Sequence, residues 1–307
     1  MSNLVIETKG LTKQYGQQIA VNGVSLRVKS GEIYGLLGRN GAGKTSVMKM
    51  LLGLTTITSG DAFLFGKPVK GNQKEIYPRI GSIIETPGFY PNLTGYENLN
   101  YFAKLKGRTT KHAVEDALEF VNLPCRDKKP FSKYSLGMKQ RLGIANAIMN
   151  DPELLILDEP TNGLDPIGIA EIRSFIKDLC TQKGKTVLIS SHQLSEIEQI
   201  ADTIGIIHNG TLLEECSMTD ISNTNRKHIF VTVSDIKKAT LLLEQKFSLT
   251  NYTTAEPDTI KIFDLSVDTR NINRTLIEAG VEVAAISIST ENLEEHFKSI
   301  TGGYGIA

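Results

Sequence analysis

The octapeptide Gly38-Arg39-Asn40-Gly41-Ala42-Gly43-Lys44-Thr45 fills every fixed position of the phosphate-binding loop pattern, with glycines at its first and sixth places and Lys-Thr at its end. An apolar run at 32–37 precedes it and is typical of a buried strand. The segment 46–52 follows, contains neither Gly nor Pro, and is typical of a helix. This strand–loop–helix order is the context that the motif requires, and it predicts an α/β core.

The residues of this loop predict contacts to a nucleoside triphosphate. Its glycines allow backbone conformations that a Cβ forbids, so successive amides can face phosphate oxygens at the positive end of the following helix. Lys44 would reach the β- and γ-phosphates, and the Thr45 hydroxyl would bind Mg²⁺. A glycine-rich turn with a chance Lys-Thr is the alternative, and the flanking elements argue against it. The candidate nucleotide ligands are Gly38, Asn40, Gly41, Ala42, Gly43, Lys44, Thr45 and Ser46.

The composition is that of a globular protein with one large and one small domain, or two of medium size. Of the 307 residues, 40% are hydrophobic and 22% are charged, which suffices for a sizeable core. The net charge of zero gives no reason to expect a nucleic-acid partner. The first residues lack a signal-peptide pattern, and no apolar run reaches the length of a membrane span. Three cysteines without metal-like spacing indicate reduced thiols in a cytosolic protein.

Three polar side chains after predicted strands form a candidate catalytic site. Asp158 and Glu159 end the apolar run 154–157, where the aspartate would bind Mg²⁺ directly or through one of its ligands and the glutamate would accept a proton from attacking water. His192 follows the strand predicted at 186–190, at the edge where open α/β sheets place ligands. Solvated acidic residues and a lone polar histidine are the alternatives.

Two other segments supply further candidates. Strands are predicted at 4–8 and 24–28, and Tyr15 between them could stack on adenine, although a Tyr beside Gly is also an ordinary turn residue. Residues 90–150 form a mainly helical insert. Within it, Ser135 suits the N-cap position of a helix, and the amides at the start of that helix could bind a second anion. The alternative is a capped helix that binds no anion.

Taken in this order, the motifs of residues 3–215 resemble the ATP-binding subunit of an ABC transporter. The resemblance identifies 38–45 as the Walker A loop, 154–159 as the Walker B strand, 135–140 as the signature region, 163–165 as the D-loop and His192 as the switch histidine. It implies an ATPase with ATP and Mg²⁺ as cofactors, and a helical subdomain in an ABC-type nucleotide-binding domain. It also implies a site that two subunits share, to which it assigns Tyr15, Ser135, Gly137 and Asp165.

Two departures narrow the resemblance. Met138 stands where the family signature has Gln, which puts that side-chain contact in doubt, and Glu85 stands where the family typically has a neutral Gln that senses Mg²⁺. Both changes resemble the ATPases of bacitracin-resistance and lantibiotic-immunity exporters. For this subgroup we expect Glu85 to contact nucleotide and metal, with a homodimer on the cytoplasmic face of the membrane, a separate permease and an antimicrobial peptide as cargo. A solvent-facing Glu85 is the alternative.

Rival functions remain open at this point. An importer subunit would use the same motifs, and Glu85 with the variant signature argues against it. A non-transport ABC ATPase acting on ribosomes or DNA would normally have two cassettes or long coiled coils, and a basic surface. A nucleotide-binding regulator with weak hydrolysis conflicts with the intact Asp158, Glu159 and His192.

The C-terminal part has a different pattern. We place an ATP-binding domain at 1–222 and an accessory domain at 223–307, joined through the polar stretch 222–226. The accessory segment predicts the order β-α-β-β-α-β of a small α+β, ferredoxin-like unit, followed by a helix from about 291. It contains no catalytic constellation, and dimer contact or regulation is its expected role.

Overall fold

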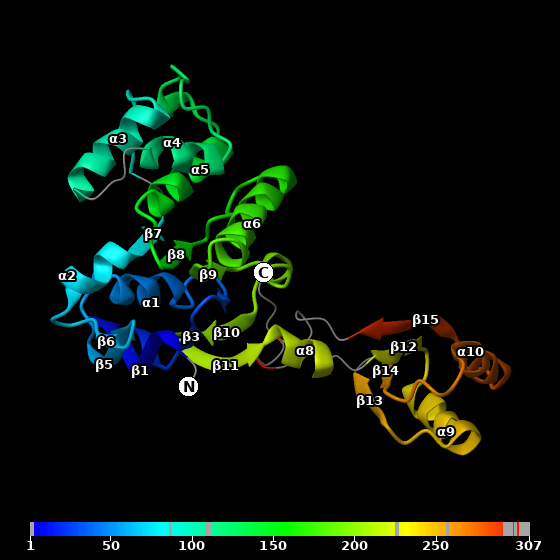
Figure 1. Ribbon diagram of the computed structural model, residues 1–307. Helices are drawn as coiled ribbons and strands as arrows, with labels where there is room; N and C mark the ends of the chain where they lie inside the picture. Colours follow the sequence, from blue (N-terminus) through cyan, green and yellow to red (C-terminus); the bar gives the residue numbers. More distant parts are fainter. Residues whose placement is uncertain are drawn as a thin grey trace. The chain divides into compact units, whose positions relative to one another are not determined.

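The computed structural model describes residues 3–85, 88–107, 112–224, 227–255, 258–290, 297 and 300. The chain divides into two compact units, the first extending to Met218 and the second beginning at Thr219 (Figure 1). The helix predicted from about 291 lies largely outside the described residues. Among the described residues, no helix is both long and apolar enough to cross a membrane.

A six-stranded sheet forms the centre of the first unit, with the strand order β11-β10-β4-β9-β8-β7. The five strands from β10 to β7 pair in parallel, and β11 runs antiparallel to β10. Every residue of β4 and β8 is buried, as their continuous apolar sequences predict. The strands are β4 (Ile33–Leu37), β7 (Ile80–Ile83), β8 (Leu154–Asp158), β9 (Thr186–Ser191), β10 (Thr203–His208) and β11 (Thr211–Ser217).

A second, antiparallel sheet has the order β2-β1-β5-β6, with β3 also paired to β1. The predicted strand at 4–8 is too short, because β1 continues to Tyr15 by pairing with both β2 and β5. The predicted strand at 24–28 is instead the end of β2 and the start of β3. The strands are β1 (Leu4–Tyr15), β2 (Gln18–Val24), β3 (Arg27–Lys29), β5 (Ser59–Leu64) and β6 (Lys67–Pro68).

Helices cover the parallel sheet and form the insert. The insert helices gather together at one end of the first unit (Figure 1). Its first helix, α3, begins with a capping box, because the Thr94 side chain accepts from the Glu97 amide while the Glu97 carboxylate accepts from the Thr94 amide. Around the sheet lie α1 (Lys44–Leu51), α2 (Gln73–Ile76), η1 (Tyr77–Arg79), α6 (Pro166–Thr181) and α7 (Leu194–Ile197). The insert contains α3 (Gly95–Lys106), α4 (Ala113–Phe120), η2 (Phe131–Lys133) and α5 (Leu136–Ile148).

The second unit has its own four-stranded sheet, in the order β13-β14-β12-β15 with all neighbours antiparallel. This order, with one helix after the first strand and one before the last, is that of a ferredoxin-like unit. Its buried core is separate and includes Val231, Leu243, Ile260 and Leu276. The elements are α8 (Met218–Thr224), β12 (Lys227–Val233), α9 (Ile236–Phe247), β13 (Tyr252–Ala255), β14 (Thr259–Ile262), α10 (Thr269–Glu278) and β15 (Val283–Thr290).

Candidate functional site

The phosphate-binding loop joins the carboxyl end of β4 to α1, so its amides lie at the positive end of that helix. Gly43 caps α1 with φ of 107°, and a Cβ there would stand 2.6 Å from the carbonyl oxygen of Ala20. Lys44 is buried, and its Nζ donates to the carbonyls of Gly38 at 2.6 Å and Arg39 at 3.2 Å. The Lys44 ammonium group is therefore held against the carbonyls of its own loop.

Asp158 is held at the end of β8 by two hydroxyl donors. Thr45 Oγ1 donates to its Oδ2 at 2.8 Å, and Ser190 Oγ donates to its Oδ1 at 2.7 Å. A hydroxyl and a carboxylate at this separation suit one face of a Mg²⁺ ion, which takes its other oxygens from phosphate and water. The pair of Thr45 and Asp158 is therefore the candidate Mg²⁺ site.

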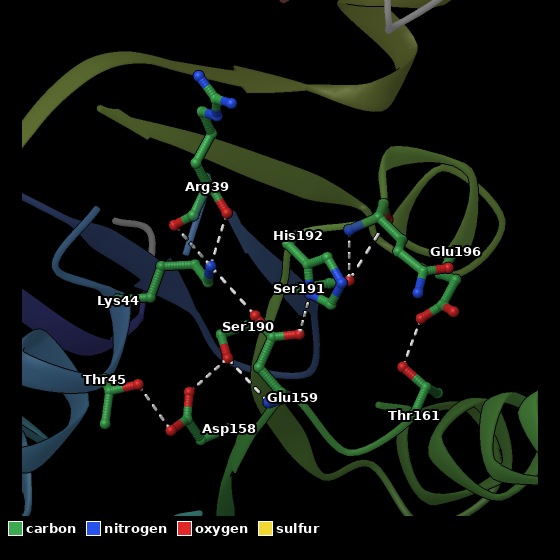
Figure 2. Close-up of polar contacts among 12 residues, drawn as sticks. Arg39, Lys44, Thr45, Asp158, Glu159, Thr161, Ser190, Ser191, His192 and Glu196 are labelled. Carbon is green, nitrogen blue, oxygen red and sulfur yellow. Dashed lines mark hydrogen bonds and ion pairs between the residues drawn. The ribbon is translucent and has the colours of Figure 1, made fainter. Parts of the chain in front are cut away.

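Glu159 stands between a cation and the histidine (Figure 2). Its Oε1 lies 3.1 Å from Lys44 Nζ, and its Oε2 lies 2.6 Å from His192 Nδ1. The backbone of Glu159 has φ of 47°, which is uncommon for a residue with a side chain, and its amide donates to Ser190 Oγ at 2.9 Å. The structure thus brings together five predicted residues: Lys44, Thr45, Asp158, Glu159 and His192.

A cavity of about 360 Å³ lies directly over the loop. Glu159 lines it together with the loop and the start of α1. The sequence did not single out the rest of its lining, which comes from β2 and the turn between β10 and β11. The Asn209-Gly210 pair does predict that hairpin turn, but not that Gly210 would donate its amide to the Ala42 carbonyl at 2.9 Å. These additional lining residues are Gln18, Ile19, Ala20, Asn209 and Gly210.

Three predicted nucleotide contacts lie elsewhere in the first unit. Ser135 caps α5 by accepting from the Met138 amide at 3.3 Å, and Asp165 caps α6 by accepting from the Gly168 amide at 2.9 Å. Gly137 lies in the first turn of α5, where an added Cβ would be 3.9 Å from Leu164. None of the three lines the cavity over the loop. If Ser135, Gly137 or Asp165 contacts a nucleotide, that nucleotide is therefore not one bound in the cavity of the same chain.

Tyr15 and Glu85 have partners that the sequence did not predict. The Tyr15 ring is 47% exposed and does not line the cavity, and Lys13 Nζ lies 4.7 Å from its centroid. Glu85 has φ of 59°, and its Oε1 lies 2.6 Å from Lys49 Nζ at the end of α1. The hydrogen bond that Lys49 donates to Glu85 raises the pKa of Lys49. The carboxylate that replaces the family's Gln is therefore balanced by a nearby cation.

The site combines a phosphate-binding loop, an Asp-Glu pair at a strand end and a histidine after the adjacent strand. Together with a parallel sheet and a helical insert, these features define an ABC-type ATPase. The family model described as ABC transporter matches residues 21–162. The bacitracin transport ATP-binding protein BcrA of Enterococcus faecalis is 55% identical over 303 residues, which cover 99% of this chain and 98% of that protein. The chain belongs to the ABC transporter family as an ATP-binding subunit.

Further relatives agree with the resemblance to peptide-antibiotic transport ATPases. The lantibiotic transport ATP-binding protein SrtF of Streptococcus pyogenes is 44% identical over 211 residues, covering 69% of this chain and 90% of that protein. A solved ATP-binding subunit of an ABC transporter superimposes with a TM-score of 0.64 at 30% identity, covering 72% of this chain and 92% of the other. The resemblance to ATP-binding subunits of bacitracin and lantibiotic transport, predicted from Glu85 and the signature region, is thereby confirmed.

Proposed function

We propose that this ABC ATPase powers a bacterial exporter that removes a peptide antibiotic of the bacitracin or lantibiotic kind. The observation that supports hydrolysis is Glu159, held between Lys44 and His192 beside the Thr45–Asp158 pair. Two relatives support a peptide antibiotic as the cargo, because their names include bacitracin transport and lantibiotic transport. The first matches nearly the whole chain, and the second matches its ATP-binding part. Glu85 and the variant signature at Ser135–Met138 agree with that subgroup.

The roles in hydrolysis follow from this geometry. The loop amides and Lys44 would bind the β- and γ-phosphates, and Thr45 with Asp158 would hold Mg²⁺, which neutralises charge on the phosphates. Glu159 Oε2 would accept a proton from the attacking water. His192 would hold the Glu159 carboxylate in place and act at the γ-phosphate. Tyr15 stacked on adenine, and Glu85 in place of the sensing Gln, complete the proposed set.

We further propose that two copies share each ATP. In one chain the cavity over the loop is open, and Ser135, Gly137 and Asp165 do not line it. The amides at the start of α5 would instead face the γ-phosphate bound by a second copy, with Asp165 at the contact. A solved bacterial ABC transporter cassette that is dimeric superimposes with a TM-score of 0.63 at 25% identity, covering 69% of this chain and 98% of the other. This likeness supports the dimer.

The partner in the membrane would be a separate permease. We place the chain at the cytoplasmic face, bound through the helical insert and the Glu85 segment. A hollow of about 700 Å³ between η1 and the ends of α3 and α5 offers one surface for such a contact. It is lined by residues that include Tyr77, Lys106 and Asn150. The second unit, residues 219–299 in the structure, would serve as an accessory domain.

Replacement of Glu159 by Gln tests the proposed chemistry. Gln keeps the size of the side chain but accepts no proton, so ATP turnover should fall by about 10²- to 10⁴-fold. With MgATP the variant should form a stable dimer in light scattering, because hydrolysis no longer separates the copies. Glu119→Gln is the control, because it makes the same charge change at an exposed position of α4, and this variant should hydrolyse ATP like the wild type. A Glu159→Gln protein with near wild-type turnover would contradict the assignment.

The cargo needs a test in cells. A strain that lacks this chain should become more sensitive to bacitracin or to a lantibiotic, and not to an antibiotic of unrelated structure. Wild-type chain should restore resistance and Glu159→Gln should not. Unchanged sensitivity to both peptide classes, with ATP hydrolysis intact, would reject the cargo while leaving the ATPase in place.

A further inference from the structure

A buried polar contact joins two segments behind the catalytic residues. The side chains of Thr161 and Glu196 are only 3% and 5% exposed, and Thr161 Oγ1 donates a hydrogen bond to Glu196 Oε2 (Figure 2). The other oxygen, Oε1 of Glu196, is buried with no hydrogen-bond partner in the described part of the chain. A buried carboxylate with a single donor is unfavourable unless that donor is kept. The contact is therefore one on which the local fold depends.

The two residues follow the catalytic pair closely in sequence. Thr161 comes two residues after Glu159, and the Asn162 amide donates to the Glu159 carbonyl at 3.1 Å, which makes this connection a tight turn. Glu196 comes four residues after His192, and its amide donates to the Gln193 carbonyl at 3.3 Å. The same two segments are thus joined twice, by Glu159 to His192 at the cavity and by Thr161 to Glu196 in the interior.

The helix that bears Glu196 needs such an anchor. With four residues, α7 has too few internal hydrogen bonds to be stable alone. Its apolar side is fixed by Ile197, which is fully buried and packs so closely on β4 that a Cβ added to Gly35 would lie 2.3 Å from its methyl group. That contact fixes α7 to the sheet, but it does not fix α7 to the segment that begins at Glu159. The bond between Thr161 and Glu196 does.

We propose that Glu196 is a positioning residue, which through Thr161 keeps His192 at hydrogen-bond distance from Glu159. The proposal rests on the proposed catalytic roles of Glu159 and His192. Because neither Thr161 nor Glu196 lines the cavity, the contact acts on the arrangement of the catalytic pair and not on nucleotide binding. The same contact holds the start of the segment that leads from Glu159 to Asp165. The segments that begin at Glu159 and at His192 therefore keep one relative position through ATP binding and hydrolysis.

Substitutions at Thr161 separate this role from others. Thr161→Val in the full-length chain keeps the volume and removes the hydroxyl, so kcat for ATP should fall about tenfold with KM unchanged. Thr161→Ser, which keeps the hydroxyl, should retain kcat within about twofold of the wild type. In a His192→Ala background, Thr161→Val should cause no further fall, because the residue through which the contact acts is gone. Equal tenfold losses in both backgrounds would show a general structural effect and overturn the proposal.

A second measurement does not depend on turnover. In the nucleotide-free protein, Thr161→Val should speed amide hydrogen exchange at 192–197, and unchanged exchange there would overturn the proposal. If Thr161→Val does not fold, Glu196→Gln should keep kcat, since its amide oxygen still accepts from Thr161, while Glu196→Met should lose it. A wild-type protein without ATP hydrolysis would instead refute the proposed function, and the exchange experiment would still decide on the contact.

Discussion

Ser190→Ala removes the hydroxyl that links the two carboxylate positions of the site. Ser190 Oγ donates to Asp158 Oδ1 at 2.7 Å and accepts from the Glu159 amide at 2.9 Å, and its side chain is fully buried. The substitution adds no atoms and alters no other part of the strand, so its effect reports these two hydrogen bonds. Asp158 keeps its second donor, Thr45.

The expected loss of stability follows from the two bonds. A hydrogen bond to a charged group contributes about 1.5–3 kcal/mol, and an amide left without an acceptor costs about 1–3 kcal/mol when buried. Because one hydroxyl makes both contacts, the two terms do not simply add, and we expect a loss of about 2–4 kcal/mol for the first unit. For a unit of this size that corresponds to a lower melting temperature by roughly 5–15 °C.

Scanning calorimetry is the suitable assay, because the chain has no tryptophan and contains two units that can unfold separately. Ser191→Ala is the matched control: the next residue is almost equally buried, but its hydroxyl bonds only to the backbone of Gln193, accepting from the amide at 2.9 Å and donating to the carbonyl at 3.4 Å. That control should lose about 1 kcal/mol. If Ser190→Ala were no less stable than Ser191→Ala, the link between Asp158 and Glu159 would not have the importance that we assign to it.

Two further predictions concern stability away from the site. Thr94→Ala removes the capping box of α3 and should lower the unfolding free energy by about 1 kcal/mol in urea titrations, whereas Thr94→Ser should not; equal losses would contradict the cap. The hydrogen bonds from Arg79 lower the pKa of Glu153, so this pair stabilises the fold above the unfolded pKa of about 4.3 and the effect is lost as pH falls through the lower folded value. Since Glu153 is exposed, Glu153→Gln should cost less than about 1 kcal/mol at pH 7 and nothing near pH 2, and a constant difference across that range would refute the linkage.

The parts of the site that lie at strand ends were predictable from sequence. Lys44, Asp158 and His192 each follow a continuous apolar run, and runs of that kind form neighbouring strands of a parallel sheet. The carboxyl ends of such strands meet at one edge, so residues more than a hundred positions apart converge without any detailed knowledge of packing. The elements β4, β9 and β8 are neighbours in that order.

The parts that depend on register were not predictable in the same way. Ser190 reaches Asp158 because the two pair directly across β8 and β9, and a shift by one residue would turn the hydroxyl to the other face. Thr161 and Glu196 meet only because α7 packs on β4 at Ile197, a contact that has no local sequence signal. Likewise, β1 extends past Thr8 because it pairs with β5 as far as Thr12 and with β2 as far as Tyr15, and this pairing outweighs its polar sequence.

Glu85 shows how a departure from the family pattern can be tolerated at such a site. A carboxylate in place of a neutral amide adds a negative charge, and at the position that the resemblance assigns to it, this charge by itself would oppose binding of the γ-phosphate. Lys49, one turn from the end of α1, provides a positive charge 2.6 Å from the Glu85 carboxylate. Because the Glu85 side chain is 66% exposed, this ion pair contributes no more than about 1 kcal/mol and opens readily. The negative charge of Glu85 is therefore balanced within the chain itself, by the ammonium group of Lys49.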